Sequence, residues 1–135
     1  MSKELKVRMN WLKGMYIYTI VGAGGFGLGM IVIPEVIKSV FGWPVAEPIV
    51  FGIVGSVWVT FGILSIFGLR SPLKFVPILL TELIYKSIWF IGVMLPLLIT
   101  KQFPSYAIPI AIILAAYIIG NIITIPFSNV FKKEQ

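Results

Sequence analysis

The sequence predicts an all-α integral membrane protein, a four-helix bundle with both termini in the cytoplasm. Of its 135 residues, 59% are hydrophobic and 12% are charged, and the mean hydropathy is +1.02. A typical soluble domain carries roughly 25% charged residues, so lipid must be the main solvent of this chain. Its length allows one transmembrane domain, residues 1–135, and no separate soluble domain.

The four predicted spans follow the gaps between charged residues. Stretches of 21, 22, 26 and 30 residues, nearly free of charge, separate Lys13 from Glu35, Glu47 from Arg70, Lys74 from Lys101, and Lys101 from Lys132. A bilayer core needs about 20 apolar residues of helix, and a helix satisfies its own backbone groups in lipid. Helices are therefore predicted near 11–33, 48–69, 73–99 and 105–127. The first is expected to be retained, because no clear signal-peptide cleavage site follows its apolar core.

The basic residues predict the orientation of these spans. Eight Lys and Arg residues fall on the side of the termini, whereas Lys38 and Lys101 are the two on the other side. Loops rich in Lys and Arg stay cytoplasmic, so both termini should be inside a multi-pass protein of the cell membrane. The net charge of +6 is then a feature of topology, and no nucleic-acid partner is expected.

A longer connection, residues 34–48, joins the first two spans. Pro34, Pro44 and Pro48 interrupt helix propagation there. Between them, Val36 to Phe41 is predicted to form a short interfacial helix with Glu35 near its N-terminal end. Glu35 is then either a solvated loop acid or a cap at the mouth of a cavity.

The composition excludes several kinds of chemistry. The chain has no Cys and no His, which rules out disulfides, thiolate catalysis, iron–sulfur ligation, Ser–His catalysis and His-based zinc or haem sites. No cofactor and no metal site is expected.

Two ionisable residues lie inside the third predicted span. Glu82 and Lys86 are one helical turn apart, in the order that favours pairing. About 18 Å of helix separates Lys86 from Lys74 and about 22 Å separates it from Lys101. Charges at this depth usually face a partner, a cavity or a site. They predict either a polar pocket, with Tyr85 and Trp89 on the same arc, or a structural ion pair that fixes helix packing.

Small and polar residues form stripes on the other predicted helices. In the first, Tyr18, Gly22, Gly25 and Gly29 recur at helical spacing, which predicts close helix packing or a groove for a flat ligand. In the fourth, Ile113, Tyr117, Asn121 and Thr124 share one face, and in the second Gly52, Ser56 and Thr60 do. If these faces converge on Glu82 and Lys86, they form a cavity wall; otherwise they hold helices together. Tyr117 and Asn121 are the candidate ligand-binding residues among them.

The layout resembles the DoxX-like small four-helix membrane proteins. The likeness lies in residues 33–42, IleProGluValIleLysSerValPheGly, after a glycine-rich first helix, and in residues 85–96, TyrLysSerIleTrpPheIleGlyValMetLeuPro. The resemblance implies an accessory membrane subunit near quinone chemistry, and it carries no catalytic residue over.

The sequence leaves several functions open. The leading hypothesis is a protein that binds a lipid-like or quinone-like molecule, or serves as an accessory subunit of a membrane complex, through Glu82 and Lys86. The expected partners are membrane lipid, such an apolar ligand, and a membrane-protein partner or further copies of the chain. The alternatives are a proton-coupled transporter working as an oligomer and an intramembrane lipid-modifying enzyme. Enzymatic activity is the less favoured of these, and no catalytic residue is assigned.

Overall fold

The protein is helical throughout the part that the computed structural model describes, residues 3–44 and 47–133. Helix accounts for 84% of the structure, and no strand occurs among these residues. The single predicted domain, 1–135, also includes residues 1–2, 45–46 and 134–135, which lie outside the described ranges.

Four long helices carry the fold, and two of them contain a π-helical turn. The first runs through α1 (Lys3–Thr19), η1 (Ile20–Gly24) and α2 (Gly25–Val32), and α3 (Pro34–Phe41) follows it. The second is α4 (Pro48–Arg70). The third runs through α5 (Val76–Trp89), η2 (Phe90–Met94) and α6 (Leu95–Ile99), and the fourth joins η3 (Ser105–Ala107) to α7 (Ile108–Thr124). A short α8 (Phe127–Val130) ends the described chain.

The structure confirms four long helices in the predicted regions and the short helix that follows the first. The segments Met9–Val32, Pro48–Arg70, Val76–Ile99 and Ser105–Thr124 are each long and apolar enough to cross a membrane. They are the spans expected of a multi-pass membrane protein.

Three predicted boundaries were wrong. The first helix begins at Lys3 and not near residue 11, because it starts ahead of its apolar segment, Met9–Val32. The third helix begins at Val76 and not at 73, because a turn occupies residues 71–75. The fourth ends at Thr124 and not at 127, because Ile125 precedes a proline and adopts an extended conformation, with ψ 125°.

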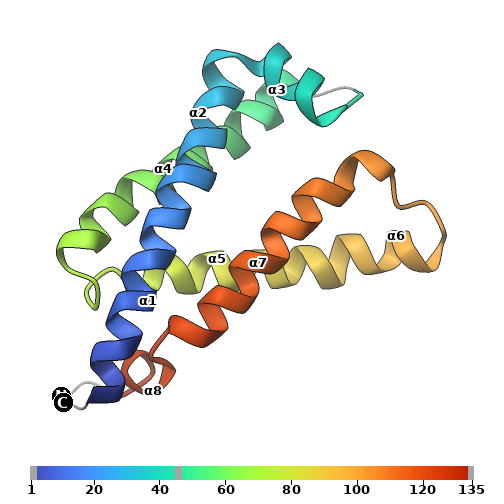
Figure 1. Ribbon diagram of the computed structural model, residues 1–135. Helices are drawn as coiled ribbons and strands as arrows, with labels where there is room; N and C mark the ends of the chain where they lie inside the picture. Colours follow the sequence, from blue (N-terminus) through green and yellow to red (C-terminus); the bar gives the residue numbers. More distant parts are fainter. Residues whose placement is uncertain (1–2, 45–46, 134–135) are drawn as a thin grey trace.

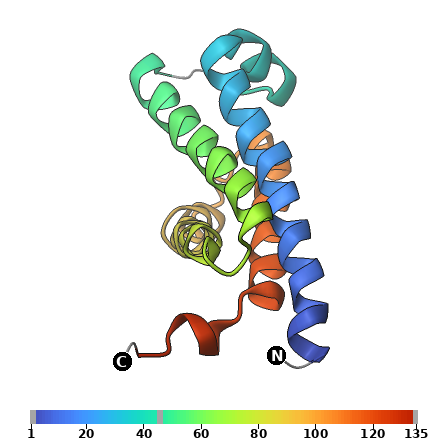
Figure 2. The ribbon, with the colours of Figure 1, turned by 90° about the vertical axis from the view of Figure 1, so that its left-hand side faces the viewer.

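The helices are arranged as two groups that meet over a limited region. The first helix packs along α4, and α5 packs against α7. Helix α5–α6 crosses the others steeply, since Figure 2 shows it end-on while α4 and α7 are seen from the side. From this crossing, the α2–α4 pair and α7 diverge toward the end that carries α3 (Figure 1), and both chain termini lie at the opposite end.

Glycines determine how closely the first helix approaches α4. A Cβ on Gly27 would lie 2.5 Å from the carbonyl oxygen of Gly55, and one on Gly62 would lie 2.7 Å from Cα of Gly24. Backbone therefore lies against backbone at these two places.

The predicted glycine stripe is only partly correct as a packing surface. Gly22 lies against the Tyr117 hydroxyl and Gly29 against Ile37, but a Cβ on Gly25 would meet nothing within 4 Å. The π-helical turn Ile20–Gly24 explains the difference, since its wider spacing rotates the following residues relative to a regular helix.

Helix α3 is held over the α2–α4 pair by aromatic side chains. The ring centroids of Phe26 and Phe41 are 5.0 Å apart, those of Phe41 and Trp43 5.5 Å, and those of Trp43 and Phe51 5.7 Å. Gly42 ends α3 in the left-handed conformation, with φ 68°, which glycine adopts without strain.

The main cluster of buried apolar residues lies between the crossing and the end with the termini. It contains five fully buried residues from α1, α5 and the chain just after α7: Leu12, Tyr16, Val76, Leu79 and Ile125. The Tyr16 hydroxyl donates a 2.6 Å hydrogen bond to the Pro72 carbonyl, which ties α1 to the turn before α5.

Candidate functional site

The charged pair of α5 is buried where the helices cross. Lys86 Nζ lies 2.8 Å from Glu82 Oε2, and the two side chains are 1% and 0% exposed. The predicted pairing at i, i+4 is therefore confirmed. Because both charges are removed from solvent, each depends on the other for stability.

Neighbouring helices complete the surroundings of this pair. The Thr19 hydroxyl of α1 donates to the Met15 carbonyl at 2.9 Å and lies 3.5 Å from Glu82 Oε2. Lys86 Nζ lies 3.5 Å from the centre of the Tyr117 ring and 5.2 Å from that of Tyr85. The ammonium group is thus held by one carboxylate and by the faces of aromatic rings.

Tyr117 also fixes α7 against the first helix. Its hydroxyl donates to the Tyr18 carbonyl at 3.0 Å, and the two tyrosine rings meet edge to face with centroids 4.3 Å apart. The phenol is held at both its hydroxyl and its ring, so the surface beneath Lys86 is rigidly placed.

Several buried polar atoms of α4, α5 and α7 have no hydrogen-bond partner among the described residues. They are Glu82 Oε1, both amide atoms of Asn121, Thr124 Oγ1 and Ser65 Oγ. Asn121 lies one helical turn beyond Tyr117 on the same face of α7, and Thr124 follows it by three residues. Buried polar groups normally find a protein or water partner, so this face retains unused polar capacity.

A small cavity lies beside Lys86. Its volume is about 20 Å³, and we call it the Lys86 cavity; it is lined by Gly22, Ala23, Phe26, Trp58, Tyr85, Lys86, Ile110, Ile113, Leu114 and Tyr117. A space of about this size accommodates a water molecule and nothing larger.

A larger cleft shares Trp58 with the Lys86 cavity. This Trp58 cleft has a volume of about 440 Å³ and is lined by Met30, Trp43, Glu47, Val50, Phe51, Val54, Trp58 and Tyr106. Trp58 lines both spaces, so the cleft and the Lys86 cavity border the same residue of α4.

The structure brings together some of the predicted site residues and not others. Tyr85, Lys86 and Tyr117 line the Lys86 cavity, and Glu82 pairs with Lys86 directly beneath it. Trp89 is not among the cavity residues and lies edge to face against Phe90, with centroids 5.1 Å apart. Asn121 is fully buried but does not line the cavity.

The polar stripe predicted on the second helix does not converge on the pair. Ser56 and Thr60 are exposed, and their hydroxyls donate to the carbonyls of Gly52 and Ser56 on the same helix. Serine and threonine satisfy themselves this way in apolar surroundings. The contribution of α4 to the site is instead Trp58, together with Phe61, which stacks on Tyr85 at 5.7 Å.

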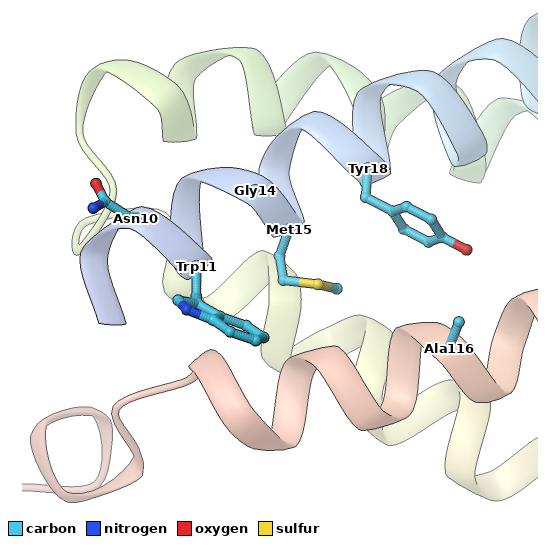
Figure 3. A pocket seen from close by; sticks show the side chains of 6 residues that line it. All are labelled: Asn10, Trp11, Gly14, Met15, Tyr18 and Ala116. Atoms are coloured by element: carbon cyan, nitrogen blue, oxygen red, sulfur yellow. The ribbon is translucent and has the colours of Figure 1, made fainter. Parts of the chain in front are cut away.

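A second groove lies between α1 and α7, near the end with the termini. Figure 3 shows Trp11, Met15 and Tyr18 extending from α1 toward Ala116 of α7. The groove has a volume of about 440 Å³, and Asn10 and Gly14 complete its lining. It contains no charged residue, so the pair in α5 remains the candidate site.

Comparisons of this chain with family models, curated proteins and solved structures found no match.

Proposed function

We propose that this protein binds a lipid-like or quinone-like molecule inside the membrane, with the polar end of that molecule at Lys86. The observation that carries the proposal is that Trp58 lines two spaces of different character. Trp58 lines both a mostly apolar cleft of about 440 Å³ and the cavity beside the buried ammonium. Ligand sites commonly combine an apolar wall with a few fixed polar groups.

Lys86 retains hydrogen-bonding capacity for such a ligand. An ammonium group has three donors, and among the described residues Glu82 Oε2 is its one hydrogen-bond acceptor. A carbonyl or hydroxyl oxygen is the matching ligand group, because Glu82 already balances the positive charge. A strongly anionic head group would place a second negative charge beside Glu82.

Binding requires Trp58 to turn aside. The Lys86 cavity accommodates a water molecule but not the head of a lipid or quinone. Moving the indole would join the cavity to the Trp58 cleft, and the ligand's apolar part would occupy the cleft. Trp58 is then the gate of the site.

The same geometry favours a binder over a transporter. Transport past the pair needs a route to both membrane faces. On the side of the termini, the buried core of Leu12, Tyr16, Val76, Leu79 and Ile125 occupies that region. The proposed opening leads instead to the end with α3. A role as accessory subunit, as in the DoxX-like proteins that the sequence resembles, is compatible with ligand binding of this kind.

Native mass spectrometry tests the proposal. The protein would be extracted gently from its own membrane as wild type and as Val54→Phe, which adds bulk to the Trp58 cleft. We expect a bound small molecule on the wild type and its loss from the variant. Val57→Phe is the matched control, because Val57 lies three residues along the same helix, is 43% exposed and does not line the cleft.

A Glu82→Gln variant extends the test to the polar end. The amide keeps the shape of the side chain but removes the charge that holds Lys86, so ligand occupancy should fall. The proposal would be contradicted if the wild type carried no small molecule. It would also be contradicted if the small molecule were retained equally by Val54→Phe and Val57→Phe.

A further inference from the structure

A third groove, separate from the Glu82–Lys86 site, lies on the outer surface of the α2–α4 pair beneath α3. Its volume is about 600 Å³, and we call it the α3 groove. Its apolar walls come from both helices and include Ile31, Ile49 and Ile53, all of them exposed on the surface of the described chain. The surface faces the lipid in a protein whose spans cross a membrane.

One acid and one base stand at the end of this groove. Glu35 and Lys38 of α3 both line it, and Lys38 Nζ lies 2.9 Å from Glu35 Oε1. The Lys38 side chain is 22% exposed and that of Glu35 83% exposed. The Lys38 side chain is therefore mostly covered and that of Glu35 mostly exposed, and a lysine at a membrane interface commonly packs its stem in this way.

The remaining polar group of the groove is already satisfied. Ser56 lines its far part, and its hydroxyl donates to the Gly52 carbonyl at 2.8 Å. From Pro48 to Ser56 the groove follows α4 for about 12 Å, at 1.5 Å per residue. The groove thus has a charged rim of both signs and an apolar body.

We propose that the α3 groove binds one phospholipid whose head group is zwitterionic and carries a primary ammonium, of the phosphatidylethanolamine kind. Its phosphate would pair with Lys38 and its ammonium with Glu35, while an acyl chain lies along Ile49 and Ile53. Because the Glu35 side chain is 83% exposed, its ion pair with Lys38 contributes little by itself, and the head group can replace that contact at small cost. This inference does not depend on what binds at Lys86.

The charges define which lipids compete. A phosphatidylglycerol head group would leave Glu35 facing a negative lipid. A phosphatidylcholine head group has no N–H to donate to the carboxylate. Lipids with the same acyl chains should therefore bind in an order set by their head groups.

The experiment is native mass spectrometry of the delipidated full chain with an equimolar mixture of dioleoyl phosphatidylethanolamine, phosphatidylcholine and phosphatidylglycerol. We expect phosphatidylethanolamine adducts to dominate on the wild type. Glu35→Gln should remove the preference over phosphatidylglycerol, and Lys38→Gln should weaken the binding of all three lipids. Both residues lie in α3, outside the buried core, so both variants should fold.

A pair of glycine substitutions tests the apolar body of the site. Gly52 lines the groove and has open space at its Cβ position, so Gly52→Leu should displace the acyl chain. Gly92→Leu is the control, because a Cβ there also meets nothing within 4 Å but lies on another helix. Equal binding of the three lipids to the wild type would overturn the proposal. So would a preference for phosphatidylethanolamine over phosphatidylglycerol that persists in Glu35→Gln, or equal lipid retention by the two leucine variants.

Discussion

Glu82 and Lys86 neutralise each other's charge inside the protein. Each is almost completely buried, and removing one partner would leave the other as an uncompensated charge. The pair therefore stabilises the crossing of α5 with α1 and α7 even if its main role is to hold a ligand. Stability and binding can be separated only by comparing single and double variants.

At this scale we expect Lys86→Met to destabilise the protein by on the order of 3 kcal/mol, since Glu82 is left buried without its partner. The double variant Glu82→Leu/Lys86→Met should recover most of that loss, because no charge remains buried. Denaturant unfolding of the protein in detergent micelles measures both. A single variant as stable as wild type would show that Glu82 without Lys86 is either hydrated or neutralised by a proton.

Residue-scale prediction from the sequence succeeded where the relevant contact is local. The Glu82–Lys86 pair follows from a spacing of four on one helix, and the burial of Tyr117, Asn121 and Thr124 together follows from one face of α7. Trp58 and Thr19 were missed, because their place at the site depends on how α4 and α1 pack on α5. No pattern within their own helices marks them.

At the scale of the element, the first helix shows how a local irregularity redirects a surface. The π-helical turn Ile20–Gly24 follows α1, and after it Gly27 rather than Gly25 faces α4. A pattern read at 3.6 residues per turn does not predict this rotation of the helix face. The conformational propensities of these residues do not predict it either. The sequence therefore predicted a glycine-mediated contact but named partly wrong glycines.

Two alanine substitutions check this contact. Gly27→Ala places a Cβ 2.5 Å from the Gly55 carbonyl oxygen and 2.8 Å from the Val59 nitrogen, both backbone atoms that cannot swing away. We expect a loss of about 1–3 kcal/mol in stability. Gly25→Ala meets nothing within 4 Å and should be neutral or stabilise the helix by up to about 1 kcal/mol. Thermal unfolding that ranks the variants in the opposite order would contradict the packing described here.

The start of α4 provides a second element-scale prediction. Glu47 caps this helix, accepting hydrogen bonds from the backbone N–H groups of Ile49 at 3.0 Å and Val50 at 2.9 Å. These two donors hold the pKa of Glu47 below its ordinary value of 4.5. A lowered pKa in the folded state means that the cap stabilises the helix above the ordinary pKa and is lost as the pH falls through the lowered one.

Glu47→Ala should therefore fray the first turn of α4 at neutral pH. Amide hydrogen exchange at Ile49 and Val50 should accelerate, while amides in the middle of α4 remain protected. A carbon-13 titration of the wild-type Glu47 carboxyl should give a midpoint below 4.5. Unchanged exchange at both amides would show that the carboxylate does not cap the helix.

For the whole molecule, the steep crossing of α5–α6 determines where the candidate site lies in the fold. Glu82 and Lys86 of α5 contact Thr19 of α1 and Tyr117 of α7. Beyond the crossing, the α2–α4 pair and α7 diverge toward the end with α3 (Figure 1). Hydropathy predicts the number and length of the spans, but it carries no information on the angle at which they cross. The Trp58 cleft is a consequence of that angle, so the sequence alone could not place it.

Orientation in the membrane is the last whole-molecule prediction. Ser71, between α4 and α5, and Gln102, between α6 and η3, are both exposed and lie in the connections at opposite ends of the third span. The chain has no native cysteine, so Ser71→Cys and Gln102→Cys each introduce a single reactive thiol. The distribution of Lys and Arg predicts that a membrane-impermeant maleimide labels Gln102→Cys on intact cells and Ser71→Cys only after permeabilisation. The reverse pattern would place both termini outside, and labelling of both variants on intact cells would mean that the third helix does not span the membrane.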